Sequence, residues 1–164
     1  MKLIPELIAS LVLFTLGNAA FSHENTRHTA VAAPVIKEQK AWGIAGEARD
    51  VQRTITLRMT DAMRFEPSRI TVREGETVRL RAVNRGRVLH EIVLGTPQEL
   101  QAHAALMKKH PGMAHDAPDM AHVPAGRHGD IVWTFNRAGT FDFACLIPGH
   151  FDAGMVGQIV VTPR

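Results

Sequence analysis

Apolar and polar residues alternate with a period of two in several short segments spread along most of the chain. In TITLRMT the alternation places Ile55, Leu57 and Met59 on one face, and RITV, TVRLRAV, DIVWTFN, TFDFAC and MVGQIVVT repeat the pattern. A period of two is typical of strands that bury one face and expose the other. About seven or eight such strands, without regular strand–helix alternation, predict an all-β fold, a Greek-key β-sandwich. A small barrel is the alternative that the same pattern allows.

One helix is predicted between two of these strands. The segment TPQELQAHAALMKKH begins with Thr96, which fits an N-cap, followed by Pro97 at the first helical position and Glu99 three residues after the cap. Pro111 should end this helix near His110. A polar loop rich in methionine and histidine is expected to follow. The helix and this Met/His-rich loop together form an insert in the predicted sandwich.

Residues 1–22 are predicted to be a signal peptide. A lysine near the start, an apolar run over residues 7–16 and small residues after it have the order of a secretory signal. Because the run is too short to span a bilayer, we expect export to the periplasm without stable membrane insertion after processing, and a retained anchor is the alternative. Residues 23–48 lack lasting periodicity and are expected to form a flexible N-terminal arm. Residues 49–164 then form one folded domain.

Charge and cysteine content restrict the function further. The formal net charge is +3, from 19 Lys and Arg against 16 Asp and Glu, and only 5% of the residues are aromatic. Without an unbroken basic run or many aromatic side chains, the chain is not expected to bind nucleic acid. The single cysteine, Cys145, cannot form an intramolecular disulfide in an exported monomer. It is therefore either an inert buried thiol or a group engaged in chemistry or metal binding.

The single cysteine lies in CLIPGHFDAGM, where Cys145, His150 and Met155 follow one another at intervals of five residues. A copper ion that cycles between Cu(I) and Cu(II) is suited by a thiolate, two imidazoles and a weak axial thioether. His90, in the upstream segment VLHEIVL, is the candidate for the second imidazole. Packing of two sheets can bring such distant strands together at one end of a sandwich.

A thiol enzyme is the alternative use of Cys145 and His150. Such an enzyme needs a polarised thiolate open to substrate and a third group that orients the base. Cys145 instead ends a strand whose inward face carries Phe141 and Phe143. The sequence His-Cys-His, which links the copper sites of multicopper oxidases, does not occur in the chain. We therefore expect no enzymatic activity.

A histidine on a mid-chain strand, followed by Cys-x4-His-x4-Met and a closing strand, resembles the cupredoxins, the type 1 copper proteins that include azurin, plastocyanin and rusticyanin. The resemblance covers residues 54–162, and HEIVLG, AGTFDFACLIPGH and AGMVG look closer still to the periplasmic copper-tolerance cupredoxins. It implies that His90, Cys145, His150 and Met155 bind one type 1 copper ion. Many blue copper proteins have an asparagine after the first histidine ligand, but this chain has Glu91, which leaves colour and reduction potential open.

The insert carries a second group of metal-binding residue types. Residues 107–122 read MKKHPGMAHDAPDMAH, in which Met-Ala-His occurs twice. Thioether sulfur prefers Cu(I), and imidazole accepts either oxidation state of copper. The candidates for additional copper binding are Met113, His115, Met120 and His122. The alternative is a solvated surface loop in which these residues bind no metal.

Taken together, these features predict an exported, monomeric type 1 copper protein that transfers single electrons in copper tolerance, by oxidising or sequestering Cu(I). The alternative is a general periplasmic electron shuttle between a donor and a terminal reductase or oxidase. A redox partner protein is expected for the transfer of electrons.

Overall fold

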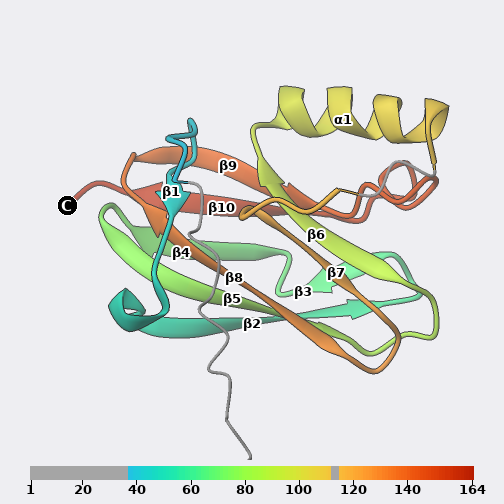
Figure 1. Ribbon diagram of the computed structural model, residues 1–164, viewed down its shortest axis with the longest axis horizontal. Helices are drawn as coiled ribbons and strands as arrows, with labels where there is room; N and C mark the ends of the chain where they lie inside the picture. The colour runs from blue at the N-terminus through green and yellow to red at the C-terminus, as the bar shows by residue number, and fades with distance from the viewer. Residues whose placement is uncertain (1–36, 112–114) are drawn as a thin grey trace, which may run out of the picture. The chain divides into compact units, whose positions relative to one another are not determined.

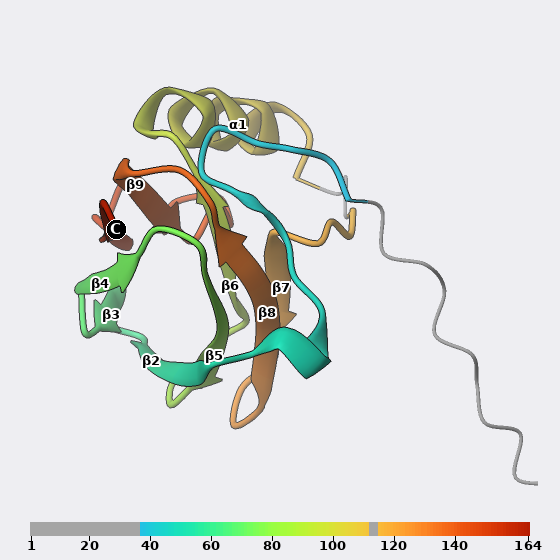
Figure 2. The ribbon, with the colours of Figure 1, turned by 90° about the vertical axis from the view of Figure 1, so that its left-hand side faces the viewer.

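Two five-stranded β-sheets pack face to face in the computed structural model, which describes residues 37–111 and 115–164 (Figures 1 and 2). The first sheet contains, in spatial order, β1 (Ile44–Ala45), β8 (His128–Phe135), β5 (Glu76–Asn84), β2 (Arg53–Thr60) and β3 (Arg64–Glu66). The second contains β4 (Arg69–Arg73), β10 (Val156–Thr162), β9 (Gly139–Ala144), β6 (His90–Gly95) and β7 (Met120–Val123). Strands β2 and β5 are parallel, as are β4 and β10. The predicted all-β sandwich is confirmed.

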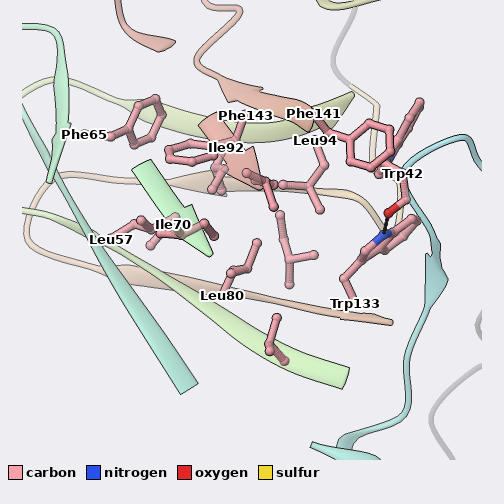
Figure 3. Close-up of a cluster of buried hydrophobic side chains, with 14 of the residues drawn as sticks. Trp42, Leu57, Phe65, Ile70, Leu80, Ile92, Leu94, Trp133, Phe141 and Phe143 are labelled. Atoms are coloured by element: carbon pink, nitrogen blue, oxygen red, sulfur yellow. Dashed lines mark hydrogen bonds between the residues drawn. The ribbon is translucent and has the colours of Figure 1, made fainter. Parts of the chain in front are cut away.

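The core between the sheets consists of the inward residues that the alternation predicts. Phe65 and Phe143 meet edge to face, with ring centroids 5.0 Å apart (Figure 3). At the other side of the view, the indole Nε1 of Trp133 donates a hydrogen bond of 3.0 Å to the carbonyl oxygen of Trp42. Cys145 belongs to the same buried cluster, so its side chain points into the sandwich as the sequence predicts.

Helix α1 (Pro97–Lys109) lies over the outer face of the second sheet (Figure 1). Its predicted N-terminus is confirmed, because Thr96 and Glu99 form a reciprocal capping box. Leu100, Ala104 and Met107 are buried and share a second apolar cluster with outward residues of β6 and β9. As a result, β6 is buried on both faces. Its first residue, the predicted ligand His90, is therefore shielded from water.

The C-terminal part of the expected flexible arm belongs to the folded sandwich. Residues 1–36, which include the expected signal peptide over 1–22, lie outside the described part of the chain. Farther on, β1 pairs with β8, Trp42 is buried, and a short 3-10 helix (Ala48–Asp50) leads into β2. Gly43 makes the close approach feasible, because its φ is +131° and a Cβ there would meet the carbonyl oxygen of Thr134 at 2.2 Å. Burial of the indole explains why this segment packs despite its lack of periodicity.

The expected Met/His-rich loop contains a strand at its C-terminal end. Strand β7 pairs with β6 and places Met120 in the apolar cluster under α1. Four residues are too few to show a clear period, and this strand was therefore expected as loop. In the parts of the chain that the structure describes, the helices are too short or too polar to cross a membrane.

Candidate metal centre

Three metal-binding side chains converge where β6 begins and β9 ends. His90 is the first residue of β6, Cys145 follows β9, and His150 lies in the loop from residue 145 to 155. Their donor atoms all lie within 4.8 Å of one another. The thiol sulfur of Cys145 is 3.2 Å from Nδ1 of His150, and the ring centroids of His90 and His150 are 5.0 Å apart. The structure therefore brings together the predicted thiol and both predicted imidazoles.

Backbone hydrogen bonds close the loop that carries these donors. The N–H of Cys145 donates to the carbonyl oxygen of Met155 at 3.1 Å, and the N–H of Met155 donates to that of His150 at 3.1 Å. Gly149 and Gly154 have φ values of +90° and +88°, a conformation that side chains disfavour. The side chain of Met155 is fully buried in the same apolar cluster as Cys145. The backbone of the expected fourth ligand is thus tied to Cys145 and His150 by the loop itself.

Burial sets the protonation of the donors in the metal-free protein. Burial raises the pKa of the Cys145 thiol to about 12, whereas a nucleophilic cysteine needs a lowered pKa. Burial, and then the neighbouring His90, lower the pKa of His150, which keeps its imidazole neutral and able to donate a lone pair. Nδ1 of His90 is buried without a hydrogen-bond partner in the described residues. A metal ion bound by these three groups would satisfy that nitrogen and stabilise the thiolate.

Glu91 connects the two segments that carry the donors. Its backbone N–H donates to the sulfur of Cys145 at 3.4 Å, and its Oε1 accepts a 2.8 Å hydrogen bond from the N–H of Leu146. Its side chain is 2% exposed, and Oε2 lies 3.1 Å from Nε2 of His122. Many blue copper proteins have an asparagine at this position. In this chain Glu91 itself connects the two ligand segments by hydrogen bonds.

The carboxylate of Asp61 contacts the imidazole of His90. Its Oδ1 lies 3.3 Å from Nε2 of His90, and its carboxylate accepts hydrogen bonds of 2.8 and 3.0 Å from the N–H of Arg87. The backbone N–H of Arg87 is the main cause that lowers the pKa of Asp61. A carboxylate at Nε2 leaves Nδ1 as the donor that faces the metal centre. Sequence reasoning missed this residue, because nothing in the turn after β2 indicates which distant strand it contacts.

The four candidates for additional copper do not form one group among the described residues. Met113 lies outside those residues. Met120 is 8% exposed and packs under α1, whereas His122 pairs with Glu91 and has Nδ1 3.7 Å from Asp116 Oδ1. His115 is exposed and faces His103, a residue of α1 that the sequence analysis did not select. The structure thus places Met120 in the core, His122 against the buried carboxylate of Glu91, and His115 in a pair at the surface.

Comparison with known proteins agrees with the fold and with copper binding. Residues 51–162 match the family of copper-binding proteins of the plastocyanin/azurin type. The chain is 48% identical over 158 residues to the copper-resistant cuproprotein CopI of Rubrivivax gelatinosus, covering 96% of this chain and 95% of the relative. It is 34% identical to the copper-resistant cuproprotein CopI of Pseudomonas aeruginosa, covering 76% of this chain and 84% of the relative.

Among solved structures, auracyanin B shares the fold. The TM-score is 0.62 at 23% sequence identity, over 76% of this chain and 97% of auracyanin B. The family match covers strands β2 to β10 and all four predicted ligand positions, from before His90 to beyond Met155. The chain therefore belongs to the plastocyanin/azurin family of copper-binding proteins, the cupredoxins.

Proposed function

We propose that this chain binds one type 1 copper ion through His90, Cys145 and His150, with Met155 as a weak axial ligand, and exchanges single electrons in copper tolerance. The observation that carries the proposal is the convergence of a thiol and two imidazoles within 4.8 Å. Bound copper would supply one-electron chemistry by cycling between Cu(I) and Cu(II). The orphaned Nδ1 of His90 supports the same ligand set.

The surrounding residues suit a copper site that changes its oxidation state without changing its coordination geometry. His90, Cys145 and Met155 are fully buried, which keeps water away from these three side chains. Glu91 and Asp61 fix the two ligand segments through hydrogen bonds to main-chain and ring nitrogens. A donor set held in this way needs little rearrangement when an electron arrives or leaves. His150 is only half-buried and is the part of the site closest to the solvent.

A protective role against copper is supported by the two relatives that are named copper-resistant cuproproteins. Such a protein would remove Cu(I) by oxidising it or by holding it. We propose that the chain acts in the periplasm, because residues 1–22 have the order of a secretory signal. It would act there as a monomer, without nucleic acid and without stable insertion in the membrane.

We propose that a redox partner docks beside His90. Val88 and Leu89, which precede this histidine directly, are 43% and 47% exposed. Exposed apolar residues next to a metal centre fit a transient protein contact. The same observation favours the alternative function, a general electron shuttle between a donor and a terminal reductase or oxidase.

Growth in raised copper tests the protective role. A strain that lacks the gene receives either the wild type or Cys145→Ser, and immunoblotting confirms equal protein levels. We expect the wild type to restore growth at high copper and Cys145→Ser to fail. Equal protection by both would contradict the proposal. A growth defect that appears without added copper, under conditions that require respiration, would instead support the shuttle.

A further inference from the structure

A second imidazole pair lies outside the metal centre, between α1 and the segment that leads to β7. The ring centroids of His103 and His115 are 5.0 Å apart, the same spacing as for His90 and His150. Two imidazoles that bind one metal ion at about 2.0–2.1 Å have ring centres roughly 4.5 Å apart at the 90° angle that Cu(II) prefers and roughly 5 Å apart at a tetrahedral angle. We propose that His103 and His115 form a second, thiolate-free site that binds Cu(II).

The two rings line a cavity that offers further donors. It has a volume of about 230 Å³ and is also lined by Glu99, Asp119 and Met120. Among the described residues, these carboxylates do not form a close cluster with the two rings as the donors at the metal centre do, and Glu99 is engaged by Thr96. The carboxylate of Asp119 would therefore have to move toward the ion, and imidazole nitrogen with carboxylate oxygen is a donor set for which Cu(II) has the highest affinity among the divalent first-row ions. Carboxylates would also offset the charge of the ion.

Two other residues of the cavity are compatible with a cation. Lys40 lines it as well, but its ammonium group lies 2.7 Å from the carboxylate of Glu38, which partly neutralises it. Trp42 is 5% exposed, and its Nε1–H has no hydrogen-bond partner in the described residues. Because this nitrogen is buried away from water, Trp42 adds an apolar wall to the cavity and no competing positive charge.

The proposed site differs from the group that the sequence suggested. It keeps His115 and Met120, adds His103 and Asp119, and excludes His122, because that imidazole pairs with the buried Glu91. It also contains no thiol, so copper bound there lacks the strong thiolate charge-transfer band. The second site therefore does not depend on the type 1 assignment and can be observed separately.

The test is a Cu(II) titration of the metal-free protein, followed by visible absorption and electron paramagnetic resonance. We expect a first equivalent that develops the charge-transfer band and a second that adds a signal with the wide hyperfine splitting of a thiolate-free site. His103→Gln and His115→Gln should each weaken the second equivalent more than about tenfold and leave the band unchanged. His110→Gln, on an exposed residue at the end of the same helix, is the matched control and should bind like the wild type.

The intact charge-transfer band shows that each variant is folded, and circular dichroism gives the same check if the band is absent. His115 is exposed, so its replacement leaves the packing of α1 unchanged even if His103→Gln destabilises the helix. The proposal is overturned if no thiolate-free signal appears. It is also overturned if the signal persists equally in His103→Gln, His115→Gln and His110→Gln, since the ion would then occupy another site.

Discussion

The metal centre and the insert over residues 96–123 both carry imidazole and thioether side chains, but they hold them differently. At the metal centre, His90 begins β6 and Cys145 directly follows β9; both are fully buried, and Glu91 joins their segments by hydrogen bonds. In the insert, His103 and His115 are twelve residues apart (115 − 103) and border the solvent. The sandwich therefore positions its donor set through contacts between distant strands, whereas the insert positions its donors within one short stretch of the chain.

The largest expected effect concerns the tie that fixes the metal centre. Glu91→Ala would leave the N–H of Leu146 buried without its 2.8 Å acceptor. We expect the free energy of unfolding of the metal-free protein to fall by about 3 kcal/mol, measured by urea denaturation. Glu91→Gln keeps an oxygen acceptor and should lose less than about 1 kcal/mol. Equal losses in both variants would show that the negative charge, not the hydrogen bond, stabilises the site.

Truncation of a buried side chain in the insert should reduce the free energy of unfolding less than Glu91→Ala does. Met120 is 8% exposed and packs against residues of α1, so Met120→Ala should lower the free energy of unfolding by about 2 kcal/mol. Met120→Leu conserves volume and should cost less than about 1.5 kcal/mol while removing the sulfur. Thermal denaturation of the metal-free proteins measures both changes. A neutral Met120→Ala would indicate that this residue behaves as part of an exposed loop.

Replacement of the axial residue should change the reduction potential more than the stability. Met155→Gln exchanges a thioether for a harder oxygen donor, which favours Cu(II). We expect the reduction potential to fall while copper stays bound, measured by voltammetry and metal analysis. Met120→Leu, which removes a thioether from the insert, is the control and should leave the potential unchanged. If Met155→Gln does not shift the potential either, then Met155 is not the axial ligand.

The smallest expected effect lies in the first sheet, where ion pairs join neighbouring strands. Arg81 lowers the pKa of Asp130, and Arg53 lowers that of Glu76. These carboxylates titrate near pH 4 in unfolded chains, so their stabilisation is complete above about pH 5 and is lost as the pH falls through the lower folded values. Asp130→Asn should therefore reduce the loss of stability in acid, measured by urea denaturation from pH 3 to pH 7.

Asp142 provides the control for this pH dependence. Burial raises the pKa of its carboxyl group, so its ionisation opposes folding as the pH rises through the folded value. Asp142→Asn should shift the pH dependence in the direction opposite to Asp130→Asn. The effect of the ion pairs should be small, because exposed pairs are screened by water and salt. Shifts of the same sign in both variants would contradict this explanation.

Much of the sandwich could be predicted, because its strands are long enough to show alternation. The capping box of Thr96 and Glu99 fixed the start of α1 in the same local way. The ligand spacing in CLIPGHFDAGM indicated copper because thiol, imidazole and thioether together have few other uses. These features are all readable within a few neighbouring residues.

The features that sequence reasoning missed depend on contacts between distant segments. Strands β1 and β7 are too short for periodicity, and the first forms because Trp42 is buried. The contact of Asp61 with His90 joins residues 29 apart, and that of Glu91 with Leu146 joins residues 55 apart. No local pattern specifies such pairs. The pairing of His103 with His115 likewise depends on where the chain turns after α1.

The most direct test of the metal centre is the spectrum of the Cu(II)-loaded protein with and without its thiol. The wild type should show an intense visible band from thiolate-to-copper charge transfer and the narrow hyperfine splitting of a type 1 site in electron paramagnetic resonance. Cys145→Ser should lose both features and keep weaker copper binding through His90 and His150. A wild type that binds one equivalent of Cu(II) without colour, or a Cys145→Ser variant that keeps the band, would contradict the assignment.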